Sequence, residues 1–109
     1  MDMTDLKEFI RGIRLFAILD DAELAELSAK FELKSVQAGE VIFGQGDPGD
    51  KFYVIYSGKI RILLKNEKGL EVNLGVRTKG DHFGETALLT EKPRNAAARA
   101  VESTVLLVL

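Results

Sequence analysis

The chain has 109 residues, 46% of them hydrophobic and 29% charged, which suits one globular domain with one core. Its net charge of -2 excludes the basic excess that is typical of nucleic-acid-binding domains. Cysteine is absent and no apolar run is long enough to cross a bilayer, which excludes thiol chemistry and a helical membrane span. The start of the chain lacks the basic and apolar blocks of a signal peptide, so we expect a cytoplasmic protein.

The first 30 residues are predicted to form a helical segment with two helices. Thr4 is a suitable N-cap for the first helix. Asp20 can cap the second, with Glu23 three residues later completing a capping box. Apolar residues then follow one face of each helix, which predicts that both pack on the rest of the chain. These residues are Leu6, Phe9, Ile10 and Ile13 in the first helix and Leu24, Leu27 and Phe31 in the second.

From about Phe31 the apolar period changes to two, which indicates β-strands. Glycine-rich turns separate the strands, and many short strands joined in this way favour a barrel or a jelly roll over residues 31–109. We expect this part and the helical segment 1–30 to form one structural domain. The predicted strands cover residues 41–43, 52–56, 60–64, 70–76, 96–101 and 104–109.

The central predicted hairpin joins two strands in which apolar residues alternate with polar or charged ones. In the first strand Lys59, Arg61 and Lys65 alternate with apolar residues and form a solvated face. A one-residue slip would expose a whole apolar set, so we expect a firm register. In the second strand, Leu70, Val72, Leu74 and Val76 are predicted to face inward, against Glu71, Asn73 and Arg77 on the other face.

Residues 83–96 interrupt the strand pattern and carry the candidate site. Residues 85–89 can form one helical turn, whose free amides suit an anion, and Gly84 allows a ligand close to the backbone. Pro93 ends any helix, and the Arg94 guanidinium can bind two phosphate oxygens, while Glu85 can accept a hydrogen bond from a sugar hydroxyl. The pattern equally fits an ion pair between Glu85 and Arg94 on the surface, which would contribute little to the stability of the fold.

These motifs resemble those of the cyclic nucleotide-binding domains of cAMP-dependent kinase regulatory subunits, cyclic-nucleotide-gated channels and catabolite-activator-type regulators. The resemblance covers nearly the whole chain and implies a mainly β fold. The expected form is a β-jelly-roll barrel, of the cupin-like double-stranded β-helix type, with N-terminal helices and a short helix in the phosphate-binding cassette. The residues that carry the resemblance are Phe83-Gly84-Glu85, Ala87-Leu88, Pro93-Arg94 and Ala96, and upstream Ala38-Gly39-Glu40, Val41-Ile42-Phe43, Gln45-Gly46-Asp47 and Tyr53-Val54-Ile55-Tyr56-Ser57-Gly58.

The resemblance also implies a role for each matching residue. Arg94 would pair with the exocyclic phosphate oxygens, and Glu85 would bind the ribose 2′-hydroxyl. Amides near Ala87 and Ala96 would complete the phosphate cradle, and Gly84 would admit the sugar. The wall beside the base would be formed by Leu74 and Val76.

The chain departs from the family pattern in three places. Thr86 stands where an apolar residue is usual, and Asn95 replaces a small or hydroxyl residue that often contacts phosphate or a guanine edge. The chain ends at Leu109 inside the last expected strand, so we expect a truncation before the C-terminal lid helices of the family. The replacement at Asn95 leaves the choice between cAMP and cGMP open, and we favour cAMP.

Three other functions are alternatives to this interpretation. A metal-dependent cupin enzyme needs several converging ligands, but His82 is the single histidine and is predicted to lie solvated in a turn. A DNA-binding regulator would need a helix-turn-helix after Leu109. A degenerate barrel that has lost its ligand and acts as a protein-interaction scaffold is the main alternative, which Asn95 and the missing lid favour weakly.

The sequence therefore predicts a regulatory binding module rather than an enzyme. Glu85 has no evident partner for general acid or base catalysis, and no metal or cofactor is expected besides the nucleotide ligand. The expected partners are a cyclic nucleotide and the effector domain of a larger protein, with a homodimer left open. No binding of nucleic acid and no insertion into a membrane are expected of this domain.

Overall fold

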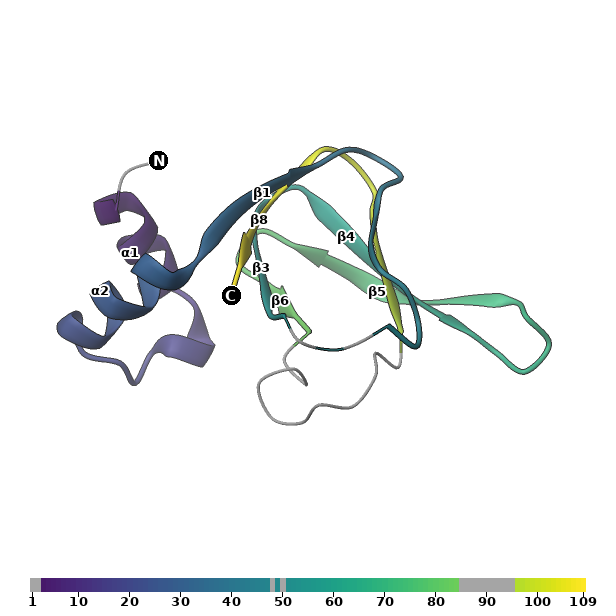
Figure 1. The fold of residues 1–109 in the computed structure, drawn as a ribbon, viewed down its shortest axis with the longest axis horizontal. Helices are drawn as coiled ribbons and strands as arrows, with labels where there is room; N and C mark the ends of the chain where they lie inside the picture. Colours follow the sequence, from purple (N-terminus) through teal and green to yellow (C-terminus); the bar gives the residue numbers. More distant parts are fainter. Residues whose placement is uncertain (1–2, 48, 50, 85–95) are drawn as a thin grey trace.

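The computed structural model describes residues 3–47, 49, 51–84 and 96–109 (Figure 1). Two helices lie at one end, and two antiparallel β-sheets form the rest of the described chain. The mainly β barrel that the sequence predicts is thereby confirmed. Among the described residues, no helix has both the length and the apolar character that a membrane crossing requires.

The N-terminal segment contains helix α1 (Met3–Arg11), the short 3-10 helix η1 (Arg14–Phe16) and helix α2 (Asp21–Lys30). Thr4 lies inside α1, so the prediction that it caps this helix is wrong. The free amides of an exposed helix start can bind water, and sequence patterns locate helix ends only to within one or two residues.

The capping box of α2 is present as predicted. Asp20 Oδ1 accepts a hydrogen bond from Glu23 N at 2.8 Å, and Glu23 Oε1 accepts one from Asp20 N at 3.0 Å. The next residue, Asp21, holds the two helices together through Lys7 Nζ, at 2.9 Å, and through the Arg11 guanidinium. The hydrogen bond from Arg11, and then that from Lys7, lowers the pKa of the Asp21 carboxyl.

The strands form two four-stranded sheets in which every neighbouring pair is antiparallel. Short strands that alternate between two facing sheets produce a jelly roll, which buries one face of each sheet against the other. The first sheet has the order β1 (Glu32–Val36), β8 (Thr104–Val108), β3 (Tyr53–Ser57) and β6 (His82–Phe83). The second has the order β2 (Val41–Phe43), β7 (Ala97–Ala100), β4 (Lys59–Lys65) and β5 (Glu71–Thr78).

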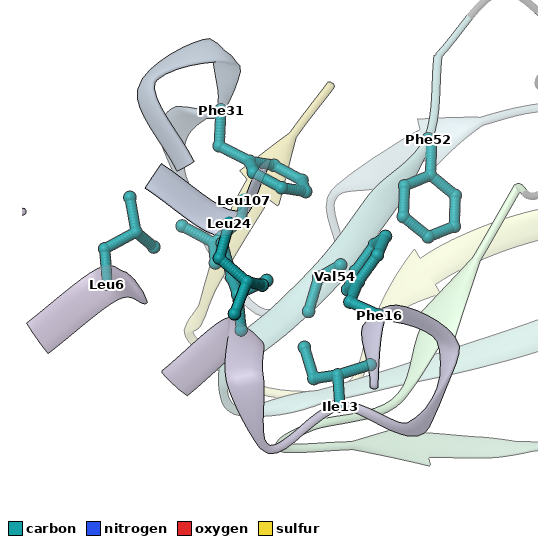
Figure 2. Close-up of a cluster of buried hydrophobic side chains, with 9 residues drawn as sticks. Leu6, Ile13, Phe16, Leu24, Phe31, Phe52, Val54 and Leu107 are labelled. Carbon is teal, nitrogen blue, oxygen red and sulfur yellow. The ribbon is translucent and has the colours of Figure 1, made fainter. Parts of the chain in front are cut away.

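Two apolar clusters lie on opposite faces of the first sheet. Val54 on β3 and Leu107 on β8 face the helices, whereas their neighbours Ile55 and Leu106 face the barrel interior. This alternation buries β3 and β8 on both faces. The helix-side cluster, most of which Figure 2 shows, comprises Leu6, Ile10, Ile13, Phe16, Leu24, Phe31, Phe52, Val54 and Leu107. The barrel cluster comprises Val36, Tyr53, Ile55, Ile60, Phe83, Ala98, Ala100, Leu106 and Val108.

Strand β5 differs from its prediction in the orientation of its side chains. It is the edge strand of the second sheet, and its hairpin with β4 extends away from the other strands (Figure 1). The apolar residues that were predicted to face inward are all exposed, with exposed fractions between 40% and 62%. These residues are Leu70, Val72, Leu74 and Val76.

A β-bulge explains this difference for Leu74 and Val76. Ile62 on β4 pairs with Gly75, but the next residue, Leu63, pairs with Asn73, which leaves Leu74 as an extra residue on β5. An extra residue reverses the facing of every position beyond it, so one continuous period of two cannot describe the whole strand. The bulge therefore overturns the prediction that Leu74 and Val76 face inward, whereas the pairing of the two strands remains defined on both sides of it.

Candidate ligand-binding site

The candidate segment 83–96 connects the two sheets. Strand β6 ends at Phe83 at the edge of the first sheet, and β7 begins at Ala97 inside the second sheet. Gly84 follows β6 with a φ of 78°, which is the left-handed region that glycine adopts readily. Both strands that flank the segment, β6 and β7, contribute side chains to the barrel cluster.

Five of the predicted site residues lie outside the described residues. The predicted short helix of the cassette lies there as well, and its assignment and the roles of these residues remain predictions. The five are Glu85, Thr86, Ala87, Arg94 and Asn95.

An aromatic cluster fixes the β6 end of the segment. The ring of Phe83 stacks on that of Tyr53 with centroids 5.0 Å apart and planes 8° apart. The ring of Phe43, from the second sheet, lies 5.8 Å from Tyr53 and 6.0 Å from Phe83. Phe83 and Tyr53 are buried, and such aromatic contacts add to the stabilisation from burial. The three rings hold the two sheets together beside Gly84.

Small side chains mark the β7 end of the segment. Ala98 and Ala100 are buried in the barrel cluster, and Ala98 pairs with Ile62 across the neighbouring strand β4. Ile62 pairs in turn with Gly75 on β5. Directly paired residues of an antiparallel sheet share a face, so Ala98, Ile62 and Gly75 form one inward row that starts two residues beyond Ala96.

The predicted wall residues of β5 have different positions in this register. Leu74 is the extra residue of the bulge, and Val76 pairs with the exposed Arg61. The inward positions beside them are Gly75 and Arg77, because their partners Ile62 and Ile60 face the barrel cluster. The prediction that Arg77 faces outward is therefore wrong, whereas the roles of Leu74 and Val76 beside a base remain predictions.

The charged side chains of the second sheet include a pair on its outer face. The Arg99 guanidinium donates to both Glu71 carboxylate oxygens, at 3.0 and 3.1 Å. Arg99 pairs in register with the exposed Arg61, which places this ion pair on the face opposite Ala98. It therefore belongs to the surface of the barrel and not to the candidate site.

The histidine differs from its prediction as a solvated turn residue. His82 is the first residue of β6, is half-buried, and its ring lies 5.6 Å from that of Phe52. Within the part of the chain that the structure describes, no three His, Cys, Asp or Glu side chains form a group that could hold a metal ion. The described residues thus offer apolar and aromatic contacts around the candidate segment.

Two facing antiparallel sheets, with an inward row of small residues close to the point where residues 83–96 join them, define the architecture of a β-roll. A model of the cyclic nucleotide-binding domain family matches residues 33–109. Because this match covers most of the chain, the protein belongs to the cyclic nucleotide-binding domain family. Domains of this family are regulatory rather than catalytic.

Individual relatives agree with this assignment. The chain is 36% identical over 98 residues to the cAMP-dependent protein kinase regulatory subunit of Mycosarcoma maydis. The aligned region covers 90% of this chain and 18% of that protein. The chain is 32% identical over 99 residues to the cGMP-dependent protein kinase of Eimeria tenella, and this alignment covers 91% of this chain and 9% of that protein. The chain thus spans less than a fifth of the length of either relative.

A solved structure extends the agreement to three dimensions. The regulatory domain of Toxoplasma gondii PKA, crystallised with cAMP, has a TM-score of 0.91 and 30% sequence identity to this chain. The match covers 98% of this chain and 41% of that one, so the N-terminal helices are included in it.

Two features of the site were not predicted from the sequence. The aromatic cluster of Phe43, Tyr53 and Phe83 joins three strands, and alternation within a single strand cannot show which rings will meet. The inward position of Arg77 depends on the bulge at Leu74. Its signal in the sequence was Gly75, because a glycine inside a strand pattern often marks a bulge.

Proposed function

We propose that this chain is a sensor module that binds a purine cyclic nucleotide at residues 84–96 and signals to an attached effector. The observation that carries the proposal is the family match over residues 33–109, together with the presence of Gly84, Glu85 and Arg94 in the segment that joins the two sheets. The larger size of the relatives supports an effector outside this chain.

The division of labour within the site follows from charge and hydrogen-bonding capacity. Arg94 is proposed to bind the cyclic phosphate, because a guanidinium can donate two parallel hydrogen bonds to phosphate oxygens. Glu85 is proposed to accept a hydrogen bond from the ribose 2′-hydroxyl. Gly84, beside the Phe83 ring cluster, leaves the backbone accessible to the sugar.

Titration calorimetry with cAMP and cGMP tests this function directly. We expect the unaltered chain to bind at least one of the two nucleotides and the Arg94→Ala variant to lose most of this affinity. The control is Arg61→Ala, which removes an exposed arginine from the outer face of β4 and should leave binding unchanged.

The opposite result would support the alternative function. If the folded, unaltered chain binds neither nucleotide, the proposal fails and a scaffold that recognises proteins is favoured. The exposed Leu70 and the three exposed apolar residues of β5 would then be the first candidates for a contact surface. No observation supports the homodimer that the sequence left open, and it is not part of the proposal.

A further inference from the structure

A hollow lies where the N-terminal helical segment meets the turn from β5 into β6. One wall is formed by residues 13–15 at the start of η1, and the other by Arg77 and residues 80–82. Its volume is about 320 Å³. These lining residues are all described, and none of them belongs to the segment 83–96. The hollow is therefore separate from the candidate ligand-binding site.

Both walls of the hollow are fixed to strand β3. Ile13 is buried in the helix-side cluster, to which Val54 of β3 also belongs. On the other wall, Gly80 N donates a hydrogen bond to Ile55 O at 2.9 Å, and Ile55 N donates one to Asp81 O at 2.9 Å. Because the two walls are attached to the same buried strand, the hollow is a preformed feature of the fold.

Basic residues predominate at this hollow. Residues 13–15 and 77–82 together contain three basic side chains and one carboxylate, although the whole chain has a net charge of -2. These residues are Arg14, Arg77, Lys79 and Asp81. The carboxylate already has a role in the turn, because Asp81 Oδ2 accepts a hydrogen bond from Thr78 N at 2.8 Å. The local excess of positive charge favours an anionic ligand.

The two arginines at the hollow have unused hydrogen-bonding capacity. Arg14 is exposed and Arg77 is half-buried, and neither makes a hydrogen bond or ion pair within the part of the chain that the structure describes. The Nη1 atom of Arg77 lies 3.1 Å from the position that a Cβ atom would take on Gly75, so no hydrogen bond opposes its rotation toward the hollow. A guanidinium can donate two parallel hydrogen bonds to one carboxylate. Both arginines are therefore available to a ligand that carries carboxylates.

Exposed apolar side chains lie beside these cations. Leu15 lines the hollow and is 45% exposed, and Ile18, three residues further along the chain, is 91% exposed. Neither belongs to the helix-side cluster or to the barrel cluster. A small free anion would use the cations alone, whereas a polypeptide can cover the apolar side chains as well. The combination therefore favours a polypeptide that presents both acidic and apolar side chains.

We propose that this hollow is a docking site for an acidic segment of a partner polypeptide. Carboxylates of the segment would pair with Arg14 and Arg77, and a flanking apolar side chain would cover Leu15. A partner bound there would contact the helical segment and the barrel at the same time. Because the hollow shares no residue with the segment 83–96, this docking does not depend on the proposed binding of a nucleotide.

The experiment is an NMR titration of the whole chain, without nucleotide, with two blocked peptides. One is the acidic peptide LEEL, and the other is its uncharged isostere LQQL. We expect LEEL to shift the backbone amides of Leu15, Gly80 and His82 until they saturate. We expect LQQL to bind roughly 10-fold more weakly or not at all, because it lacks the charge-assisted hydrogen bonds.

Three variants and a small anion serve as controls. Arg14→Gln and Arg77→Gln should each weaken the binding of LEEL roughly 5-fold or more. Arg61→Gln removes the same charge from the outer face of β4 and should leave binding unchanged. Glutarate carries two carboxylates without apolar flanks and should bind more weakly than LEEL. Thermal unfolding of each variant verifies that it is folded.

The outcomes separate this inference from the proposed function. Equal binding of the two peptides, or binding of LEEL that is unchanged in Arg14→Gln and Arg77→Gln, overturns the docking site. The absence of saturable shifts at millimolar LEEL also overturns it. Glutarate that binds as tightly as LEEL overturns the polypeptide as the occupant. Each of these results leaves the nucleotide sensor intact, because that function is tested separately through Arg94.

Discussion

Strands β3 and β8 are covered on both faces, whereas β5, at the edge of the other sheet, exposes three large apolar side chains. The covered strands lie between the helix-side cluster and the barrel cluster, which share no residue but use alternate positions of the same strands. The edge strand has a bulge, a glycine and an inward arginine in place of such packing. The comparison indicates that one region holds the fold together, whereas the other contributes little apolar packing and is the region to which the proposed ligand site is assigned.

The largest expected effect is the loss of a side chain from the covered region. Phe52→Ala should lower the free energy of unfolding by about 3–5 kcal/mol, because this fully buried ring contacts Phe16 and His82 in the helix-side region. Leu70→Ala on the exposed hairpin should change it by less than about 0.5 kcal/mol. Urea denaturation measures both, and equal losses would contradict the division into a supporting and an open region.

A smaller effect is expected at the turn between β3 and β4. Gly58 has a φ of 102°, and a Cβ there would lie 2.3 Å from Thr104 Oγ1 and 2.7 Å from Thr104 Cα. Gly58→Ala should therefore destabilise the chain by about 2–4 kcal/mol, through both backbone strain and the clash with β8. Gly69→Ala shares a positive φ but meets no atom within 4 Å, so thermal unfolding should show a loss of only about 1 kcal/mol.

A still smaller loss is expected from the capping box of α2. Asp20→Ala removes the acceptor of the hydrogen bond from Glu23 N and should cost about 1 kcal/mol. Asp20→Asn keeps a side-chain acceptor and serves as the matched variant. If both variants unfold at the same denaturant concentration as the unaltered chain, the capping box does not contribute to the stability of the folded chain.

The smallest effect is a pH dependence at the contact between the helices. The pKa of the Asp21 carboxyl is lowered in the folded chain, chiefly by the hydrogen bond from Arg11. A lowered folded pKa gives stability that is complete above the unfolded pKa of aspartate, near 3.9, and is lost as the pH falls through the folded value. Asp21→Asn should therefore be slightly less stable than the unaltered chain at pH 7.

The same difference should disappear in strong acid. Melting curves from pH 7 down to pH 2 would show this convergence, and added salt should reduce the difference at pH 7 because the pair is exposed. A stability difference between the two chains that does not change with pH would mean that the Asp21 charge does not stabilise the contact between α1 and α2.

The sequence was most informative where local rules and tertiary packing agree. The capping box of Asp20 and Glu23 could be predicted because its two hydrogen bonds lie within four residues. The alternation of Tyr53 to Tyr56 could be predicted to form a strand, because both of its faces find apolar partners. Because both faces of this strand are buried, its apolar residues fit the fold whichever way each side chain points.

The candidate site was harder to predict because its geometry depends on an irregularity. The insertion of Leu74 into β5 reverses the facing of the residues beyond it. The apolar alternation alone does not show where this reversal falls, and Gly75 is the one local sign of it. Arg77 was consequently placed outside and the apolar residues of β5 inside. The contact of Phe43 with Tyr53 and Phe83 depends on how the two sheets meet, which no local pattern determines.

An NMR titration that follows every backbone amide while cAMP or cGMP is added tests most directly whether the region around β5 and the candidate segment is the ligand site. The ring current and charge of the nucleotide should shift amides from Leu74 to Val76 on β5, together with those around Gly84 and Ala96–Ala98. Amides beside the helix-side cluster, such as that of Leu24, should hardly move. Larger shifts at the helices than at β5, or a bound nucleotide that leaves the amides of Gly75 and Ala98 unshifted, would contradict this account.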